Sequence, residues 1–334
     1  MQGTAIIIGN MIGGITGGGS VSPSTFFILK EGGSGDKILD ETGQFLVSEL
    51  APAPPFIGLL DTYTGAAAGY SLRSLSSTYT GFAIKVQDIV GGATLDVGFD
   101  SNKELDTAAI AAYGGSNDVF VETWYDQSGN GNNSTQVTAS QRPKIYDGTT
   151  GMVVDNNGKP TLAYASDRVL LTNELSLRSN APDAFLISLV AEGTQAPSDG
   201  EYFGGITLNS TNFFATYASS SNYRWRHTND AGTGNVNTSF AYPSPAPVAG
   251  EMSLLNLYIE SSTKKMQLNG QQLTASGTTT WSSTSGYKFN LGVIGRPYAR
   301  ALNLQVSELV VWPNQSSTGL SEIQTNINTF YSIY

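Results

Sequence analysis

The stretch Trp124-Tyr125-Asp126-Gln127-Ser128-Gly129-Asn130-Gly131-Asn132-Asn133 decides how this chain folds. The residues before it, Val119 to Val121, are the β-branched and aromatic types that favour a strand. After Trp124 almost every residue is a turn former. Gly129 and Gly131 adopt positive φ at low cost, and Asp126 and the asparagines can bond their own backbone. The stretch therefore predicts a sharp structural corner at the rim of a β-sheet, with Trp124 in the core.

The same corner offers oxygens from Asp126, Asn130 and Asn132 that could face a calcium ion. A calcium-binding helix–loop–helix motif would show alternating acidic ligands and a closing glutamate, and neither is present. The chain has no cysteine and a single histidine, His227, which excludes thiolate and multi-histidine metal sites. The structural interpretation of the corner is favoured, and no metal or cofactor is expected.

Composition excludes several classes of partner. Charged residues make up 13% of the chain, about half the usual share, and the net charge is −10. Such a surface repels a phosphate backbone, so nucleic acid is not expected as a partner. The apolar residues 5–15 are interrupted by glycines and lack a basic flank, so neither a signal peptide nor membrane insertion is expected.

The first 55 residues differ from the rest of the chain. They hold two short apolar segments, Ala5–Ile8 and Phe26–Leu29, separated by a glycine-rich stretch. So short a segment buries too little apolar surface to fold alone, so these strands need another chain or copies of themselves. The proline-rich residues 51–55 then form a stiff linker. We expect an assembly segment over 1–55 and a second domain over 56–334.

The second domain has the rhythm of a β-sandwich, with short strands and a turn signal about every ten residues. Asp106 is positioned to cap a helix that ends at Gly114-Gly115. A closing helix is expected over Leu320–Tyr334, with Ser321 as its N-cap. The main predicted strands after residue 184 are 185–191, 201–208, 212–217, 222–227, 253–260, 264–268, 287–294 and 303–312.

Together with Gly69–Leu75, the corner stretch resembles the catalytic domain of α-L-arabinofuranosidases of glycoside-hydrolase family 54. The pair of motifs is also similar to lectin-like proteins of phages that infect Bacteroidetes. The resemblance covers residues 57 to 180 well and the remainder at the level of the fold. It implies an all-β, concanavalin-like jelly-roll β-sandwich, also related to laminin-G-like domains, with a few short helices and a small N-terminal β anchoring segment.

The family's catalytic carboxylates have no clear counterparts. The resemblance places the general acid at Arg296, and an arginine cannot donate a proton at working pH. The family's nucleophile corresponds to the region 223–230, where Asp230 is the only carboxylate. The late glutamate Glu308 is interpreted as structural. The sequence therefore predicts that the chain is not an enzyme.

A sugar site is expected around the segment 223–230. One interpretation puts Tyr223 and Trp225 in the core and leaves the arginines solvated. The other sends arginines into a groove for an acidic glycan, because guanidinium groups pair with carboxylates in two-point contacts. The residues predicted to bind glycan are Arg224, Trp225, Arg226, His227, Asp230 and Arg296. The residues of the structural corner are Trp124, Tyr125, Asp126, Gly129, Asn130 and Gly131.

These observations, with the phage resemblance, predict a non-catalytic virion protein: a head fibre, capsid decoration or tail fibre. It is expected to be assembled in a host cytoplasm, to be exposed outside the cell, and to attach to host-surface carbohydrate. We expect a homotrimer whose residues 1–55 contact other virion proteins. Two alternatives stay open, an α-L-arabinofuranosidase-like glycoside hydrolase and a structural spacer without a ligand.

Overall fold

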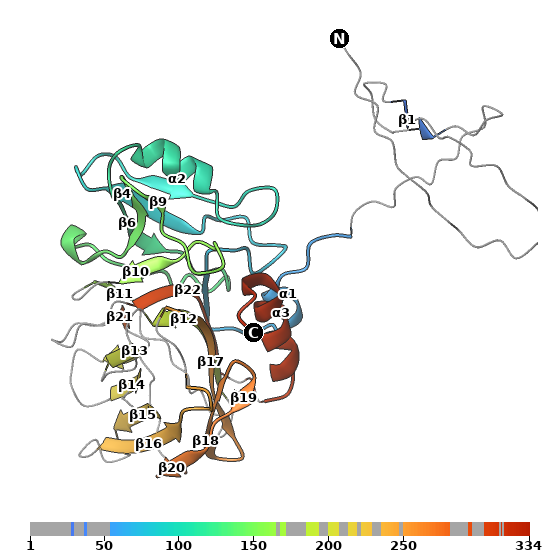
Figure 1. Cartoon of the computed structure of the whole chain (residues 1–334), viewed down its shortest axis with the longest axis vertical. Helices are drawn as coiled ribbons and strands as arrows, with labels where there is room; N and C mark the ends of the chain where they lie inside the picture. Colours follow the sequence, from blue (N-terminus) through green and yellow to red (C-terminus); the bar gives the residue numbers. More distant parts are fainter. Residues whose placement is uncertain are drawn as a thin grey trace, which may run out of the picture. The chain divides into compact units, whose positions relative to one another are not determined.

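The computed structural model describes residues 28–29, 37–38, 54–164, 168–171, 185–193, 200–206, 213–218, 222–228, 235–246, 250–280, 293–295, 304–313, 315 and 317–334 (Figure 1). The chain divides into two units, Met1–Phe56 and Ile57–Tyr334. In the first unit, the described strands β1 (Ile28–Leu29) and β2 (Lys37–Ile38) pair antiparallel. The predicted segment Ala5–Ile8 lies outside the described residues.

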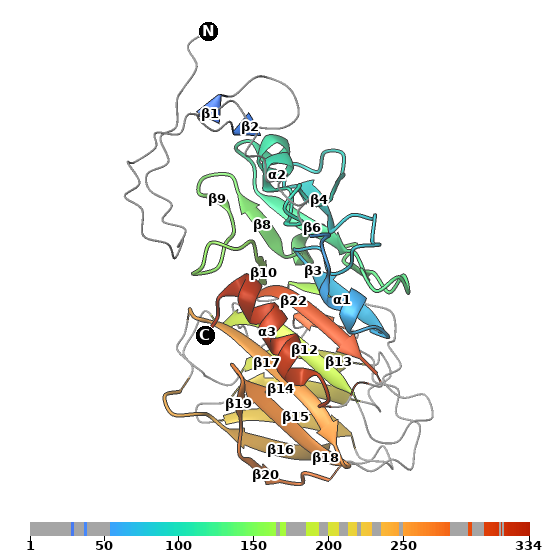
Figure 2. The same ribbon diagram turned by 90° about the vertical axis from the view of Figure 1, so that its right-hand side faces the viewer.

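One sheet of the second unit is built from long antiparallel strands. Its order is β18 (Thr263–Leu268), β17 (Met252–Glu260), β12 (Leu186–Gly193), β22 (Leu304–Trp312) and β3 (Ala68–Ser71). The short strand β19 (Gln271–Gln272) extends it beside β18. The helices α1 (Leu59–Thr62) and α3 (Leu320–Tyr331) cover one face, and Figure 2 shows α3 lying across the strands. We call this whole sheet the helix-covered sheet.

The second sheet packs on the other face of the helix-covered sheet. Its strand order is β20 (Ala275–Gly277), β16 (Asn235–Ala241), β15 (Asn222–Thr228), β14 (Phe213–Ala218), β13 (Gly200–Ile206), β21 (Val293–Gly295) and β11 (Val169–Leu171). All of these pairs are antiparallel, as in a jelly-roll sandwich.

The N-terminal third of the second unit forms short strands that continue both sheets. They are β4 (Ile84–Asp88), β5 (Leu95–Val97), β6 (Val119–Trp124), β7 (Ser134–Thr135), β8 (Lys144–Asp147), β9 (Gly151–Met152) and β10 (Leu162–Tyr164). Strand β7 pairs with β11 and strand β10 pairs with β22. The helix α2 (Thr107–Gly114) and a 3-10 turn, Ala139–Gln141, complete this part.

The helix-covered sheet is buried on both faces, and its alternating residues divide between two cores. On β12, Ile187 and Leu189 point into the core between the sheets. Their neighbours Leu186 and Val190 point the other way, where Ile323 of α3 packs on them. Because successive side chains of a strand point to opposite faces, a strand covered on both sides is apolar at most of its positions.

The predicted all-β sandwich is confirmed, and the bounds of the predicted strands are off by one or two residues where the structure describes them. The strand β16, Asn235–Ala241, was not predicted. Asp106 caps α2 as predicted, because its carboxylate accepts the amide hydrogen of Ala109 at 3.0 Å. The predicted cap at Ser321 is wrong. The helix α3 begins at Leu320, and its N-cap is Gly319 with φ of 80°, a conformation that glycine adopts easily.

Candidate functional site

The corner after β6 is tied into the core. Trp124 is fully buried, and its ring centroid lies 5.8 Å from that of Tyr70 on β3. Gly129 and Gly131 adopt φ of 87° and 73°, so both use the freedom that glycine gives. The chain therefore turns back toward β3 immediately after its large buried anchor.

Asp126 holds this corner with both carboxylate oxygens. Its Oδ1 accepts the amides of Gly69 at 2.9 Å and Ser128 at 2.8 Å. Its Oδ2 accepts the Ser128 hydroxyl at 2.8 Å and the Asn132 amide at 3.0 Å. The side-chain amide of Asn130 donates to the Ala66 carbonyl at 2.8 Å. The Asp126 oxygens already face hydrogen-bond donors, so the arrangement is that of a structural corner.

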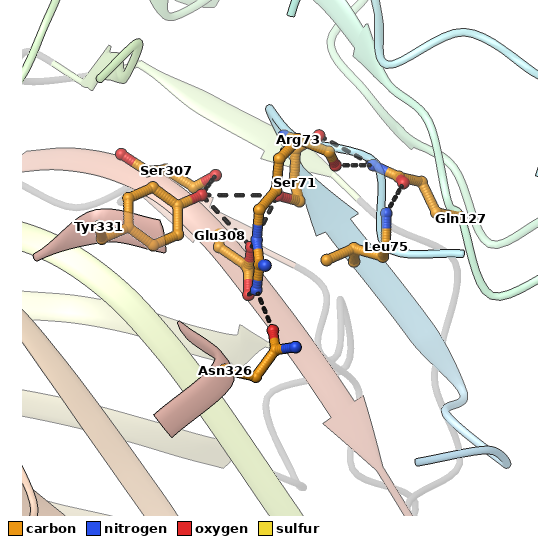
Figure 3. Close-up of polar contacts among 8 residues, drawn as sticks. All are labelled: Ser71, Arg73, Leu75, Gln127, Ser307, Glu308, Asn326 and Tyr331. Carbon is orange, nitrogen blue, oxygen red and sulfur yellow. Dashed lines mark hydrogen bonds and ion pairs between the residues drawn. The ribbon is translucent and has the colours of Figure 1, made fainter. Parts of the chain in front are cut away.

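The second half of the motif, Gly69–Leu75, is joined to the corner through Gln127 (Figure 3). The side-chain amide of Gln127 donates to the carbonyls of Ser71 at 2.9 Å and Arg73 at 3.0 Å. Its Oε1 accepts the Leu75 amide at 2.7 Å. Gln127 thus satisfies three buried backbone groups of a segment that is leaving the sheet.

Arg73 and Glu308 form a buried ion pair beside this segment (Figure 3). The Arg73 Nε lies 2.8 Å from Glu308 Oε2, and a second guanidinium nitrogen lies 3.1 Å from Oε1. The guanidinium also donates to the Asn326 side chain of α3 at 3.0 Å. Glu308 is fully buried and Arg73 is 8% exposed.

The ion pair is closed by hydroxyl groups. The Ser71 hydroxyl donates to Glu308 Oε2 at 2.8 Å, and the Tyr331 hydroxyl lies 3.3 Å from the same oxygen. Burial lowers the pKa of Arg73, but the Glu308 charge more than offsets this and the pKa is raised. Burial and the charge of Glu308 also raise the pKa of Tyr331 well above its usual value. Arg73 and Tyr331 therefore both keep their protons.

This geometry bears directly on catalysis by Glu308. A glycosidase carboxylate must reach the glycosidic bond. Both oxygens of Glu308 are occupied by Arg73 and two hydroxyls, and the residue lies on the face that α3 covers. Glu308 is therefore structural, as the sequence predicts.

The strand β15 divides its residues between two faces. Tyr223 is 2% exposed and Trp225 is fully buried, with the Trp225 ring 5.5 Å from that of Phe185. Trp225 was predicted to bind glycan. The structure corrects this, because its ring fills the core and presents no face to a sugar. Arg224, between the two, is half-buried on the opposite face.

Alternation along β15 places position 226 on the face of Arg224, and position 227 on the face of the two core residues. On the neighbouring strand β16, Asn237 is exposed and Ser239 is half-buried on the arginine side. We use the name polar face of the second sheet for the side of that sheet that points away from the core. By register it carries the positions Glu201, Ala215, Tyr217, Arg224, Arg226, Asn237 and Ser239.

Four of the six residues predicted to bind glycan lie on one strand, β15. Arg296 and Asp230 lie outside the described residues, and Arg296 follows the end of β21 in the chain. Two strands, β13 and β14, stand between β21 and β15. At about 4.8 Å per strand, β21 and β15 are roughly 14 Å apart. Nothing in the sequence indicated this separation.

The strand register adds one acidic position that the sequence analysis missed. Glu201 on β13 pairs with Tyr217 on β14, which pairs with Arg224 on β15. The three positions therefore form one row across the polar face. The sequence held little indication of this position, because Glu201 is an isolated acidic residue near the start of a strand. Only the strand register aligns it with the arginine positions.

Two further observations concern partners. In the part of the chain that the structure describes, no group of three or more His, Asp or Glu is placed to hold a metal ion. The described helices are all too short or too polar to span a bilayer.

No protein-family model matches the sequence, and no curated protein matches it. Solved structures do match the fold. A mutant of a GH54 α-L-arabinofuranosidase soaked with 4-nitrophenyl α-L-arabinofuranoside overlays with a TM-score of 0.60 at 15% identity, over 82% of this chain and 66% of that one. An arabinofuranosidase complexed with arabinofuranosyl-α-1,2-xylobiose gives 0.58 at 16% identity, over 82% and 65%. The chain thus spans just under two thirds of the length of these structures.

This likeness corrects the prediction that the chain is not an enzyme. That prediction rested on Arg296 standing where the resembling family has its acid. Three solved structures that overlay on 82% of the chain are arabinofuranosidases, including one soaked with a cyclic sulfate inhibitor. An arginine at one aligned position does not exclude catalysis by carboxylates elsewhere on the sheet. The comparisons lend no support to the predicted virion role, which stays a prediction. At these identities the likeness establishes the fold that this chain shares with the arabinofuranosidases.

Proposed function

We propose that this chain is a carbohydrate-active protein, a glycoside hydrolase of the α-L-arabinofuranosidase type that acts at the polar face of the second sheet. The observation that carries the proposal is the overlay of 82% of the chain on an arabinofuranosidase structure with a TM-score of 0.60. The proposal is about chemistry at a specific face, because one fold hosts many functions and the site must be argued separately.

The polar face carries one acidic position, Glu201, and a second carboxylate, Asp230, comes after β15 in the chain, outside the described residues. Glycoside hydrolysis uses two carboxyl groups, about 5 Å apart in retaining enzymes and about 6.5–9.5 Å apart in inverting ones. Glu201 lies in the row of Tyr217 and Arg224, and Asp230 follows β15 two residues after its last residue, Thr228. We assign these two carboxylates as the acid and base pair, with Arg224 and Arg226 as sugar-binding groups.

The test is release of 4-nitrophenol from 4-nitrophenyl α-L-arabinofuranoside by the purified full chain. We expect Glu201→Gln and Asp230→Asn each to lower the rate by a factor on the order of 10²–10⁴, the usual contribution of a general acid or base. Glu251→Gln is the matched control, since Glu251 is an exposed carboxylate just before β17. A parent chain that releases no more nitrophenol than buffer would contradict the proposal. Full activity in both variants would contradict the residue assignment.

A second candidate is display of this domain on a particle, as the sequence predicts for a virion protein. It is favoured by the division of the chain into Met1–Phe56 and Ile57–Tyr334, with the strand pair β1–β2 in the first unit. In this proposal residues 1–55 assemble a homotrimer, contact other virion proteins, and present the sandwich to host-surface carbohydrate. Light scattering of the full chain decides, because a monomeric mass rules out the trimer.

A further inference from the structure

An aromatic cluster lies on the surface where the segments around β4, β5 and β6 meet. It consists of Tyr79, Phe82, Phe99 and Tyr125. Phe82 is 49% exposed, and the other three rings are half-buried. Single exposed apolar side chains are ordinary, but neighbouring aromatic rings that share a surface indicate a binding site.

The backbone fixes this cluster. The Ala83 amide donates to the Val97 carbonyl at 2.8 Å, and the Ala83 carbonyl accepts the Tyr125 amide at 2.9 Å. Three segments are therefore held side by side, and Ala83, the residue after Phe82, is hydrogen-bonded to both neighbours. A Cβ atom at Gly98 would lie 3.8 Å from the Phe82 ring, so the ring rests directly over this glycine. The cluster is built into the fold by strand pairing.

The rings form two pairs. The centroids of Phe82 and Tyr125 lie 6.4 Å apart at 45°, and those of Tyr79 and Phe99 lie 6.5 Å apart at 71°. The Tyr79 hydroxyl donates to the Phe82 carbonyl at 2.8 Å. A Cβ at Gly81 would lie 2.5 Å from that hydroxyl, so a side chain at this position would displace the hydrogen-bonded ring. Tyr79 is therefore fixed by the backbone of Phe82 and packs on Phe99, while the Phe82 ring packs on Tyr125.

A carboxylate stands at the edge of the cluster. The Tyr125 hydroxyl donates to Asp96 Oδ1 at 2.6 Å. Burial and this hydrogen bond raise the pKa of Tyr125, so the phenol keeps its proton and the Asp96 carboxylate keeps its orientation. Asp96 is exposed, and its Oδ2 accepts no hydrogen bond from the described part of the chain. It remains available to an incoming hydroxyl group.

Charge decides between the possible occupants. The negative charge of Asp96 raises the pKa of Tyr125 and that of Asp126 raises the pKa of Tyr79, whereas the nearby Glu122 is paired with Arg142 at 2.7 Å. The cation in register with Asp96 is Lys85, its cross-strand neighbour, which forms no ion pair in the described structure. An anionic sugar is repelled here, and so is a second copy of a chain whose net charge is −10.

We propose that the aromatic cluster with Asp96 is a binding surface for a neutral polysaccharide chain, separate from the polar face. Sugar C–H faces pack on aromatic rings, and a fixed carboxylate accepts sugar hydroxyls. Apolar rings with a few placed polar groups are the usual composition of a site for a small organic ligand. The inference goes beyond the proposed hydrolysis and stands or fails independently of it.

The experiment measures retardation of the full chain in native gels that contain arabinoxylan. We expect the parent chain to be retarded, and Phe82→Ala and Asp96→Asn to bind at least about tenfold more weakly. Ile89→Ala is the matched control, because Ile89 is 62% exposed just after β4 and outside the cluster. Thermal melts establish that the variants are folded, and a gel with polygalacturonate tests the exclusion of acidic chains.

The outcomes separate the two proposals. Lost retardation in the cluster variants, with unchanged release of 4-nitrophenol, supports a separate binding surface. If the parent chain is retarded through Phe82 but releases no 4-nitrophenol, the binding surface is supported and the proposed hydrolysis is contradicted. Equal retardation of the parent and Phe82→Ala overturns the surface, and so does a parent that arabinoxylan does not retard. A Phe82→Ala effect on molecular mass alone, seen by light scattering, assigns the cluster to self-association and also overturns it.

Discussion

The Arg73–Glu308 pair and Lys264 bury charge in two different ways. Arg73 and Glu308 meet in a two-point ion pair that Ser71 and Tyr331 complete. Lys264 on β18 is also fully buried, but its amine donates only to the Thr238 hydroxyl and the Thr278 carbonyl, each at 2.9 Å. No carboxylate in the described structure pairs with it.

The difference shows how a counter-charge determines the pKa of a buried cation. Removing a charge from water costs several kcal/mol unless a partner offsets it. At Arg73 the partner keeps the guanidinium charged and raises its pKa, despite burial. At Lys264 burial has no opposing charge, and it lowers the pKa to about 8. The first site is locked in one state, whereas the second can release its proton.

The largest expected effect follows from breaking the pair. Glu308→Gln leaves the buried Arg73 without a counter-charge, so we expect the free energy of unfolding to fall by about 3–5 kcal/mol. Urea unfolding measures it. The control is Glu322→Gln, because Glu322 is exposed on α3 and should change stability by less than about 0.5 kcal/mol.

The double variant Arg73→Met, Glu308→Leu sharpens this test. Replacing both partners removes the unpaired charge, so the double variant should be more stable than Glu308→Gln alone. If Glu308→Gln and its control unfold at the same urea concentration, the pair contributes nothing and the comparison with Lys264 fails.

A smaller effect of opposite sign is expected at Lys264. Lys264→Met keeps a similar volume and removes a desolvated charge, so we expect stability at pH 7 to rise by about 1–3 kcal/mol. The Thr238 hydroxyl still donates to the Thr278 carbonyl. Lys265→Met is the matched control, since this neighbour on β18 is only half-buried. A less stable Lys264→Met chain would show that the two hydrogen bonds of the amine outweigh its burial.

The smallest effect is the pH dependence of the parent chain. The folded pKa of Lys264, about 8, lies below its unfolded value of roughly 10.4, so between these limits the unfolded state binds more protons. Stability should therefore rise with pH above 8, by at most about 1.4 kcal/mol per pH unit. The range from about pH 8 to 9.5 isolates the effect of Lys264. Burial raises the pKa values of Tyr164 and Tyr331, so these residues lower the stability of the folded chain once unfolded tyrosine ionises near pH 10. The same slope in Lys264→Met would assign the dependence to another group.

The predicted and the missed site residues differ in what fixes their positions. The burial of Trp225 and the half-burial of Arg224 follow from strand alternation, which the sequence shows. The row of Glu201, Tyr217 and Arg224 follows from strand register, which the sequence does not show. The same holds for Arg73 and Glu308, which are 235 residues apart in the chain and share one hydrogen-bonded pair.

Local chemistry was therefore enough for the short strands and turns of the second domain, the buried Trp124 and the cap at Asp106. Each of these depends on residues within about one turn or one strand, because turn formers, alternation and caps act over short stretches. Tertiary structure alone decided which charges are paired, which acidic position shares a face with the arginines of β15, and that aromatic rings from separate segments meet around Phe82. The physical reason is that these contacts join strands distant in sequence, and no short-range propensity encodes their register.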